Sequence, residues 1–246
     1  MHRGRVFFSR MFEASEDAAH WAMAYNPALK GRVVAVGDLA ADRLLALRSE
    51  RERLRSEMGY IPNERVVLFQ STFGPSSLME TYGRGVIEAL VRLASTGGLK
   101  CILQSHPKHW AGPDSTWRDI LLSQEGKPGV RILHAGEDWV PAMIASDLAV
   151  TDHTSLTLTY SLLGKPILFF QHPDTVHLPG GPFEHLARIL PRLSSPENLA
   201  ADLDRAEREF PASEVAKVTE IILSYPGEAA PRMRRELCKS LNLHAA

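Results

Sequence analysis

Short runs of apolar residues alternate along the chain with longer segments in which apolar residues recur at helical spacing. Six runs have the length and composition of strands: 32–37, 65–71, 99–105, 130–134, 147–151 and 166–171. Helical periodicity covers the segments between them, at about 39–58, 77–96, 115–124, 138–146 and 155–163. The strands are continuously apolar, which is typical of strands buried on both faces. The pattern therefore predicts an α/β fold with a parallel sheet and helices on both faces.

Both ends of the chain depart from this alternation. The segment ASEDAAHWAMAY has a helical pattern that ends near Asn26–Pro27, so we expect an N-terminal helical extension over 1–31 and one domain over 32–246. A helical C-terminal tail follows residue 183, with helices near 197–208, 212–224 and 230–241. Its last helix has a face of Met233, Leu237 and Leu241 among basic residues, which favours docking on its own domain and leaves a membrane-surface role open.

Composition and charge narrow the classes of partner. Twenty-eight basic and twenty-nine acidic residues leave a formal net charge of -1, which excludes a general electrostatic attraction to nucleic acid, so any anion must be held locally. The start of the sequence has no signal-peptide pattern, and no segment reaches membrane-spanning length. Cys101 and Cys238 are too far apart for a CxxC site. We expect a cytoplasmic protein, with peripheral association at the inner face of the membrane left open.

Polar residues follow the strands at the edge where an open parallel sheet binds its ligands, beyond the carboxyl ends. Four of the six strand ends carry a histidine: His106, His134, His153 and His172. We predict that ligand contacts come from this edge, namely from Ser71, Thr72, His134, Asp152, His153, Thr154 and Ser155.

The corner TDHTS joins a strand to a helix. Thr154 and Ser155 fall at the N-cap or first turn of that helix, where hydroxyls, free backbone N–H groups and the helix dipole together bind a phosphate. Asp152 and Thr154 are also ordinary capping residues, so plain capping is the alternative.

His106 is the predicted catalytic residue. It follows an apolar strand directly, and Pro107 fixes the direction of the chain after it. An imidazole there is able to take a proton from an attacking hydroxyl near neutral pH, while a hydrogen bond within the loop is the alternative role. Zinc binding by His106, His153 and His172 at neighbouring strand ends is the other alternative, but apart from Asp152 the spacing and carboxylates of such a site are absent, so we expect no metal. We also expect no cofactor.

Two further features admit both a binding and a packing role. Trp139 is either a wall for a nucleotide base or a residue packed on the core. Gly83 and Gly85 lie within a helical segment, which favours close packing over contact with a dinucleotide.

Several segments together resemble the CDP-glycerol glycerophosphotransferase family, the teichoic-acid primases and polymerases. They are VVAVGDLAADRLL, RVVLFQSTFG, ILQSHPKH, IASDLAVTDHTSLTLTYSLLGKPILFF and PGGPF, and they span about residues 32–185. The chain departs from the family's pattern at His153, which replaces the tyrosine of DYSS, and at STFGPSS, which lacks the tryptophan and arginine of PTWR. The TDSGG corner of UDP-GlcNAc 2-epimerases is a more distant likeness.

The resemblance implies a GT-B architecture, in which two Rossmann-like domains face each other across a cleft, and this chain resembles its nucleotide-binding C-terminal half. It implies a transferase whose donor is CDP-glycerol or a nucleotide sugar, with His106 implicated in catalysis and Thr154 and Ser155 at the diphosphate. A separate domain or subunit would bind the acceptor hydroxyl. Two alternatives stay open: a non-catalytic nucleotide-sugar-binding module, and a relative of the UDP-sugar 2-epimerases.

Overall fold

The computed structural model describes residues 8–111 and 115–241 of the 246-residue chain. It divides into two compact units, one of residues 1–48 with 216–246 and a larger one of residues 49–215. Residues 1–7, where the expected N-terminal extension begins, lie outside the described residues. The expected division into an extension over 1–31 and a domain over 32–246 stays a prediction.

The larger unit contains a five-stranded parallel sheet, with the strands in the order β5-β4-β3-β6-β7. Each strand lies inside one of the predicted ranges: β3 (Val66–Gln70), β4 (Lys100–Gln104), β5 (Val130–Leu133), β6 (Leu148–Thr151) and β7 (Ile167–Phe169). The central strand β3 is buried along its whole length, as its continuous apolar sequence predicts. The expected α/β fold with a parallel sheet is confirmed.

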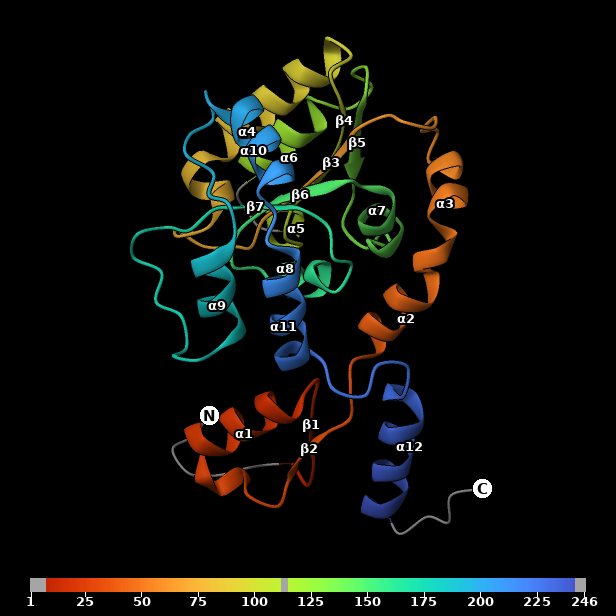
Figure 1. Ribbon diagram of the computed structural model, residues 1–246, viewed down its shortest axis with the longest axis vertical. Helices are drawn as coiled ribbons and strands as arrows, with labels where there is room; N and C mark the ends of the chain where they lie inside the picture. Colours follow the sequence, from red (N-terminus) through yellow and green to blue (C-terminus); the bar gives the residue numbers. More distant parts are fainter. Residues whose placement is uncertain (1–7, 112–114, 242–246) are drawn as a thin grey trace. The chain divides into compact units, whose positions relative to one another are not determined.

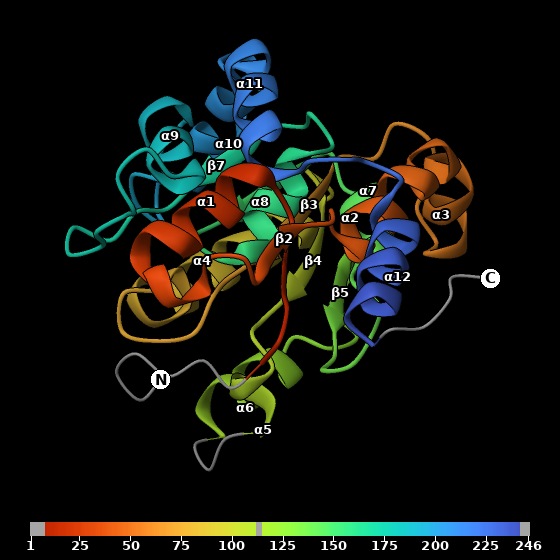
Figure 2. The same cartoon turned by 90° about the horizontal axis from the view of Figure 1, so that it is seen from below.

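Helices cover both faces of this sheet. On one face, α4 (Leu78–Ser95), α6 (Thr116–Leu122) and α10 (Leu199–Arg208) contribute to a single apolar core with the strands. On the other face lie α3 (Arg51–Glu57) and α7 (Val140–Ala145) (Figure 1). In Figure 2, α4 and α7 again lie on opposite sides of the strands. The remaining helices of this unit are α5 (Lys108–Ala111), α8 (Ser155–Ser161) and α9 (Pro182–Ile189). Helix α11 (Ala212–Ile222) begins in this unit and continues into residues of the smaller one.

The two glycines of α4 allow close packing, as the sequence favours. A Cβ atom on Gly83 would lie 2.9 Å from Sδ of Met79 and 3.1 Å from the ring of Trp117. A Cβ atom on Gly85 would lie 2.9 Å from two ring carbons of Pro196. All of these distances are shorter than ordinary contacts of a Cβ atom, so only glycine fits at either position without movement of a neighbour.

The smaller unit corrects one expectation. The strand predicted over 32–37 is present as β2 (Val33–Ala35), but it pairs in parallel with β1 (Met11–Glu13) in a separate two-stranded sheet. The end of β2 therefore does not belong to the binding edge of the large sheet. Asp38, which follows it, is the N-cap of α2 (Leu39–Leu47), where its carboxylate accepts from the N–H groups of Ala40 and Ala41 at 2.7 and 2.8 Å.

Helices make up the rest of the smaller unit. Ser15 caps α1 (Glu16–Tyr25), which ends at Asn26 as predicted and is followed by a short 3₁₀ turn, η1 (Pro27–Leu29). The predicted helix over 39–58 is interrupted by a second 3₁₀ turn, η2 (Arg48–Glu50), between α2 and α3.

The C-terminal helix α12 (Ala229–Ser240) contacts α2. The carboxylate of Asp42 on α2 accepts from the N–H groups of Gly227 and Ala229 at 2.6 and 2.8 Å, which holds the start of α12. The predicted apolar face of this helix is not buried, because Leu237 and Leu241 are 44% and 64% exposed. Among the described residues, no helix is long and apolar enough to cross a bilayer.

Candidate functional site

The connections of the large sheet diverge at its centre. From β3 the chain crosses to β4 and then to β5 on one side, whereas β6 lies on the other side of β3 and leads to β7. The carboxyl ends of β3 and β6 therefore flank a topological switch point, the place where open parallel sheets bind their ligands. Ser71 directly follows β3 and Asp152 directly follows β6, so both residues lie at the switch point.

The carboxylate of Asp152 connects the two loops at the switch point. It is fully buried and accepts hydrogen bonds from Ser71 Oγ (2.7 Å) and from the N–H groups of Thr72 (3.0 Å), Leu78 (2.8 Å) and Thr154 (3.1 Å). These donors belong to the β3–α4 loop, the start of α4 and the start of α8. Asp152 therefore positions the backbone on both sides of the switch point.

Thr154 is the N-cap of α8, at the position that the sequence predicts. Its Oγ1 accepts from the N–H of Leu156 at 3.4 Å, and its carbonyl accepts from the N–H of Thr157 at 2.9 Å. The N–H groups of these residues are thus engaged inside the protein. Neither N–H group is therefore free for a phosphate, which leaves the exposed Ser155 as the residue of this corner that would contact one.

A hollow of about 230 Å³ lies where β3, β4 and α8 meet. It brings together four of the residues that the sequence singles out, Ser71, His106, Thr154 and Ser155, and Trp139 lines it as well. The other lining residues are Gln70, Gln104, Ser105, Pro107 and Leu156. No lining residue carries a formal charge, so polarity in this hollow comes from amides, hydroxyls and one imidazole.

Three polar side chains of the hollow, those of Gln70, Gln104 and Ser105, were not singled out from the sequence. Gln70 is fully buried, and its amide donates from Nε2 to Oε1 of Gln104 at 2.8 Å. Oε1 of Gln70 and Oγ of Ser105 are buried without a hydrogen-bond partner. The sequence does contain a signal for the two glutamines, because each is the polar last residue of an apolar strand, in VVLFQ and KCILQ.

The ring of His106 is oriented by its own turn. The backbone N–H of Lys108 donates to Nδ1 of His106 at 3.1 Å, so Nδ1 holds a lone pair and the neutral ring carries its proton on Nε2. Burial lowers the pKa of His106, and the nearby Lys108 lowers it further. At neutral pH the imidazole is therefore an N–H donor at Nε2. A base at Nε2 would require the other tautomer, which the Lys108 N–H opposes.

His172 repeats this turn after β7, where the N–H of Asp174 donates to Nδ1 of the ring at 3.2 Å. The shared sequence is His-Pro-X, with the donor two residues after the histidine.

His109 is a buried histidine that sequence reasoning missed as a site residue. Neither ring nitrogen has a hydrogen-bond partner, and Nε2 lies 3.5 Å from Oε1 of Glu80. Burial lowers the pKa of His109, although Glu80 acts in the opposite direction. The ring centroid lies 5.7 Å from that of Phe73 and 6.4 Å from that of His106, so His109 supports the wall behind His106.

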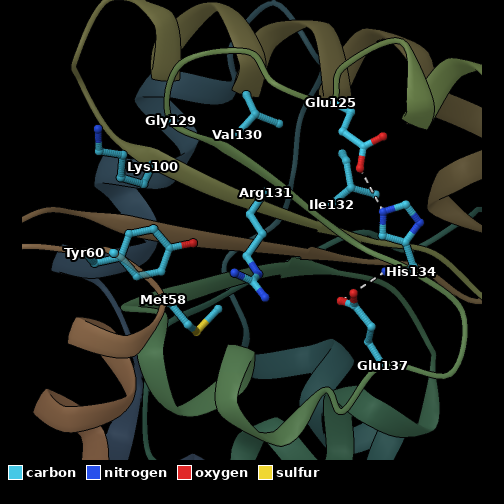
Figure 3. A pocket seen from close by; sticks show the side chains of 11 residues that line it. Met58, Tyr60, Lys100, Glu125, Gly129, Val130, Arg131, Ile132, His134 and Glu137 are labelled. Carbon is cyan, nitrogen blue, oxygen red and sulfur yellow. Dashed lines mark hydrogen bonds and ion pairs between the residues drawn. The ribbon is translucent and has the colours of Figure 1, made fainter.

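His134 and His153 lie apart from the 230 Å³ hollow. His134 lines a second hollow, of about 470 Å³, along the edge strand β5, where its Nε2 lies 3.0 Å from Oε1 of Glu125 (Figure 3). Nδ1 of His153 is buried without a partner. The pKa of the neighbouring His177 is lowered mainly by burial and further by His153. Within 8–111 and 115–241, no three His, Cys, Asp or Glu residues gather as metal ligands.

The sequence model of the CDP-Glycerol:Poly(glycerophosphate) glycerophosphotransferase family matches residues 13–177 of this chain. This chain belongs to that family. The matched range of the glycerophosphotransferase-family chain contains β3 to β7, the switch point and the whole lining of the 230 Å³ hollow. No curated protein matches the chain.

Solved structures give the fold of the glycerophosphotransferase-family chain. The wall teichoic acid polymerase TagF has 15% sequence identity and a TM-score of 0.70, with 96% of this chain and 58% of TagF covered. UDP-GlcNAc 2-epimerase from Neisseria meningitidis, bound to UDP-GlcNAc, has 14% identity and a TM-score of 0.54, with 94% and 61% covered. This chain thus spans less than two thirds of either relative. The expected single half of a GT-B fold is confirmed.

Proposed function

We propose that this chain is the donor-binding part of a glycerophosphotransferase or related GT-B transferase, which moves a glycerophosphate or sugar from a nucleotide diphosphate donor to a hydroxyl acceptor. The observation that carries the proposal is the hollow at the switch point, where His106 meets Thr154 and Ser155. Membership of a family named for CDP-glycerol supports this donor. The epimerase of similar fold, bound to UDP-GlcNAc, supports a nucleotide ligand more generally.

The geometry favours a hydrogen-bonding role for His106 over the base role expected from the sequence. In the transfer of glycerophosphate, a bond forms between the acceptor oxygen and phosphorus as the bond from phosphorus to the leaving CMP breaks. Nε2–H of His106 would donate to a phosphate oxygen and stabilise the charge that develops there. The Ser155 hydroxyl would hold the neighbouring phosphate. The proton of the acceptor hydroxyl would pass to a base on the acceptor-binding domain or subunit.

Isothermal titration calorimetry with CDP-glycerol, CDP and UDP tests the proposal. We expect the wild-type chain to bind CDP-glycerol, and we expect His106→Ala to weaken binding of CDP-glycerol and CDP by about tenfold or more through loss of a hydrogen bond to a charged group. Lys127→Ala, at an exposed position outside the hollow, is the control and should bind like the wild type. Absence of binding by all three nucleotides would refute a donor site. Unchanged affinity in His106→Ala would return the residue to the base role.

A non-catalytic nucleotide-sugar-binding module is the second candidate. It is favoured by the lining of the hollow, in which His106 is the one acid–base side chain and its Nδ1 is already engaged. Single-turnover transfer of glycerophosphate from labelled CDP-glycerol to a hydroxyl acceptor separates the two candidates. Binding without transfer, also in the presence of an acceptor-binding subunit, would favour the module.

A further inference from the structure

Two of the residues that line the 230 Å³ hollow carry buried polar atoms without a hydrogen-bond partner. Gln70 is fully buried and Ser105 is 7% exposed, yet Oε1 of Gln70 and Oγ of Ser105 have no hydrogen-bond partner. A buried polar atom without a partner costs about 1–3 kcal/mol, and such atoms are rare in native proteins. Two of them in one hollow indicate a place that a polar group fills when the site is occupied.

Backbone geometry holds these groups together. Gln70 and Gln104 are the last residues of β3 and β4 and lie opposite each other in the parallel ladder. Nε2 of Gln70 donates to Oε1 of Gln104 at 2.8 Å, which fixes the Gln70 side chain and leaves its Oε1 without a partner. Ser105 directly follows β4 and lines the same hollow. These polar groups are therefore positioned by the ends of two neighbouring strands.

The hydrogen-bonding capacity of Gln70 and Ser105 selects the class of ligand group that fits beside them. An amide oxygen only accepts hydrogen bonds, whereas a serine hydroxyl both donates and accepts. A phosphate oxygen, which only accepts, cannot satisfy Oε1 of Gln70. A hydroxyl, amine or amide both fits the hydrogen-bonding capacity and carries no charge, which agrees with a lining that has no charged side chain.

We propose that Gln70, Gln104 and Ser105 form a neutral subsite that binds an uncharged, hydrogen-bond-donating part of the donor, beside the phosphates at His106 and Ser155. This inference rests on the proposed function. The same chemistry is offered by the amino and amide edge of a nucleotide base and by the hydroxyls of a polyol or sugar, and ligands that carry one or both of these parts distinguish the two sources.

The variants Gln70→Met and Ser105→Ala remove the polar atoms with little change of volume, and Ser105→Thr retains the hydroxyl. The control is Ser123→Ala, whose hydroxyl donates to a carbonyl at the end of α6, outside the hollow. Each is titrated with CDP-glycerol, CDP and UDP. We expect Gln70→Met and Ser105→Ala to lose about tenfold in affinity for CDP-glycerol, and Ser105→Thr to retain most of it.

The pattern of losses identifies the bound part. An equal loss for CDP and CDP-glycerol assigns the subsite to the base, and a loss confined to CDP-glycerol assigns it to the glycerol hydroxyls. Both results support the subsite. Wild-type affinity of Gln70→Met and Ser105→Ala for every ligand would overturn it and leave the donor site intact, whereas a wild-type chain that binds no nucleotide would overturn the proposed function itself.

Thermal unfolding of each variant shows whether it is folded and provides a second test of the subsite. Replacing a buried hydroxyl that lacks a partner by hydrogen should leave the unfolding midpoint of Ser105→Ala equal to or above that of the wild type. A clear decrease would mean that the hydroxyl of Ser105 stabilises the unliganded fold, which contradicts a subsite whose partner is the ligand.

Discussion

Replacement of Asp152 by Asn tests whether one carboxylate holds the switch point together. Asn has the same shape as Asp, but one of its two terminal groups is an NH₂ donor. Oδ1 accepts from the N–H groups of Thr72 and Thr154, and Oδ2 accepts from Leu78 N–H and the Ser71 hydroxyl. Whichever way the Asn side chain turns, its NH₂ group faces a backbone N–H that has no other acceptor there.

The size of the effect follows from these contacts. A buried donor that loses its partner costs about 1–3 kcal/mol, and hydrogen bonds to a charged group are worth about 1.5–3 kcal/mol. Because Asp152 is fully buried, water cannot replace the lost acceptor. We expect Asp152→Asn to lower the free energy of unfolding by about 2–4 kcal/mol, most of it from the N–H groups of Leu78 or Thr154.

Urea denaturation followed by far-ultraviolet circular dichroism measures this loss. With a slope of about 1–3 kcal/mol per molar urea, the midpoint should fall by about 1–2 M at an unchanged slope. Asp17→Asn, at an exposed position, should stay within about 0.5 kcal/mol of the wild type. If Asp152→Asn were equally neutral, the carboxylate would not be what connects the two loops at the switch point.

Three further outcomes are expected. Lys165 donates from Nζ to the carbonyls of Met143, Ile144 and Ser146 at 2.6–3.1 Å, so Lys165→Met should lower the free energy of unfolding by about 2–4 kcal/mol in the same urea assay. Gly85→Ala should destabilise by about 1 kcal/mol in thermal unfolding, because the contact with the Pro196 ring outweighs the gain in helix propensity; an increase in stability would show that the ring moves aside. Burial lowers the pKa of His109 in the folded state, so the unfolded chain binds more protons below about pH 6.5, and stability should fall as pH decreases through that range. His109→Gln should make this fall shallower, and an unchanged pH profile would exclude His109 as a cause.

The large sheet was predictable because its signal is strong. Strands buried on both faces must be continuously apolar, and β3 to β7 each lie within a predicted range. The pairing of β2 was not predictable, because its partner β1 is three residues long and the sequence MFE has no distinct strand pattern. The short helices α5 and α9 were missed for a similar reason, since each lies close to proline or glycine residues that indicate turns.

The candidate site was predictable in position and less so in chemistry. The rule that ligands bind after the strands identifies Ser71, His106, Thr154 and Ser155, which line one hollow. It overlooks Gln70, because this residue is the last of its strand and not the first of the loop. The tautomer of His106 depends on a backbone N–H and therefore requires coordinates.

Because a backbone N–H orients the His106 ring in the His-Pro-X turn, that orientation is insensitive to most substitutions at residue 108. In many enzyme sites a carboxylate orients the histidine and also raises the basicity of the ring. Here a main-chain N–H orients the ring, and it neither adds charge nor makes the ring more basic. Any side chain at position 108 preserves that amide, with one exception. Lys108→Pro would delete the amide hydrogen, free the ring to rotate and exchange tautomers, and so convert a fixed proton donor into an ordinary titrating histidine.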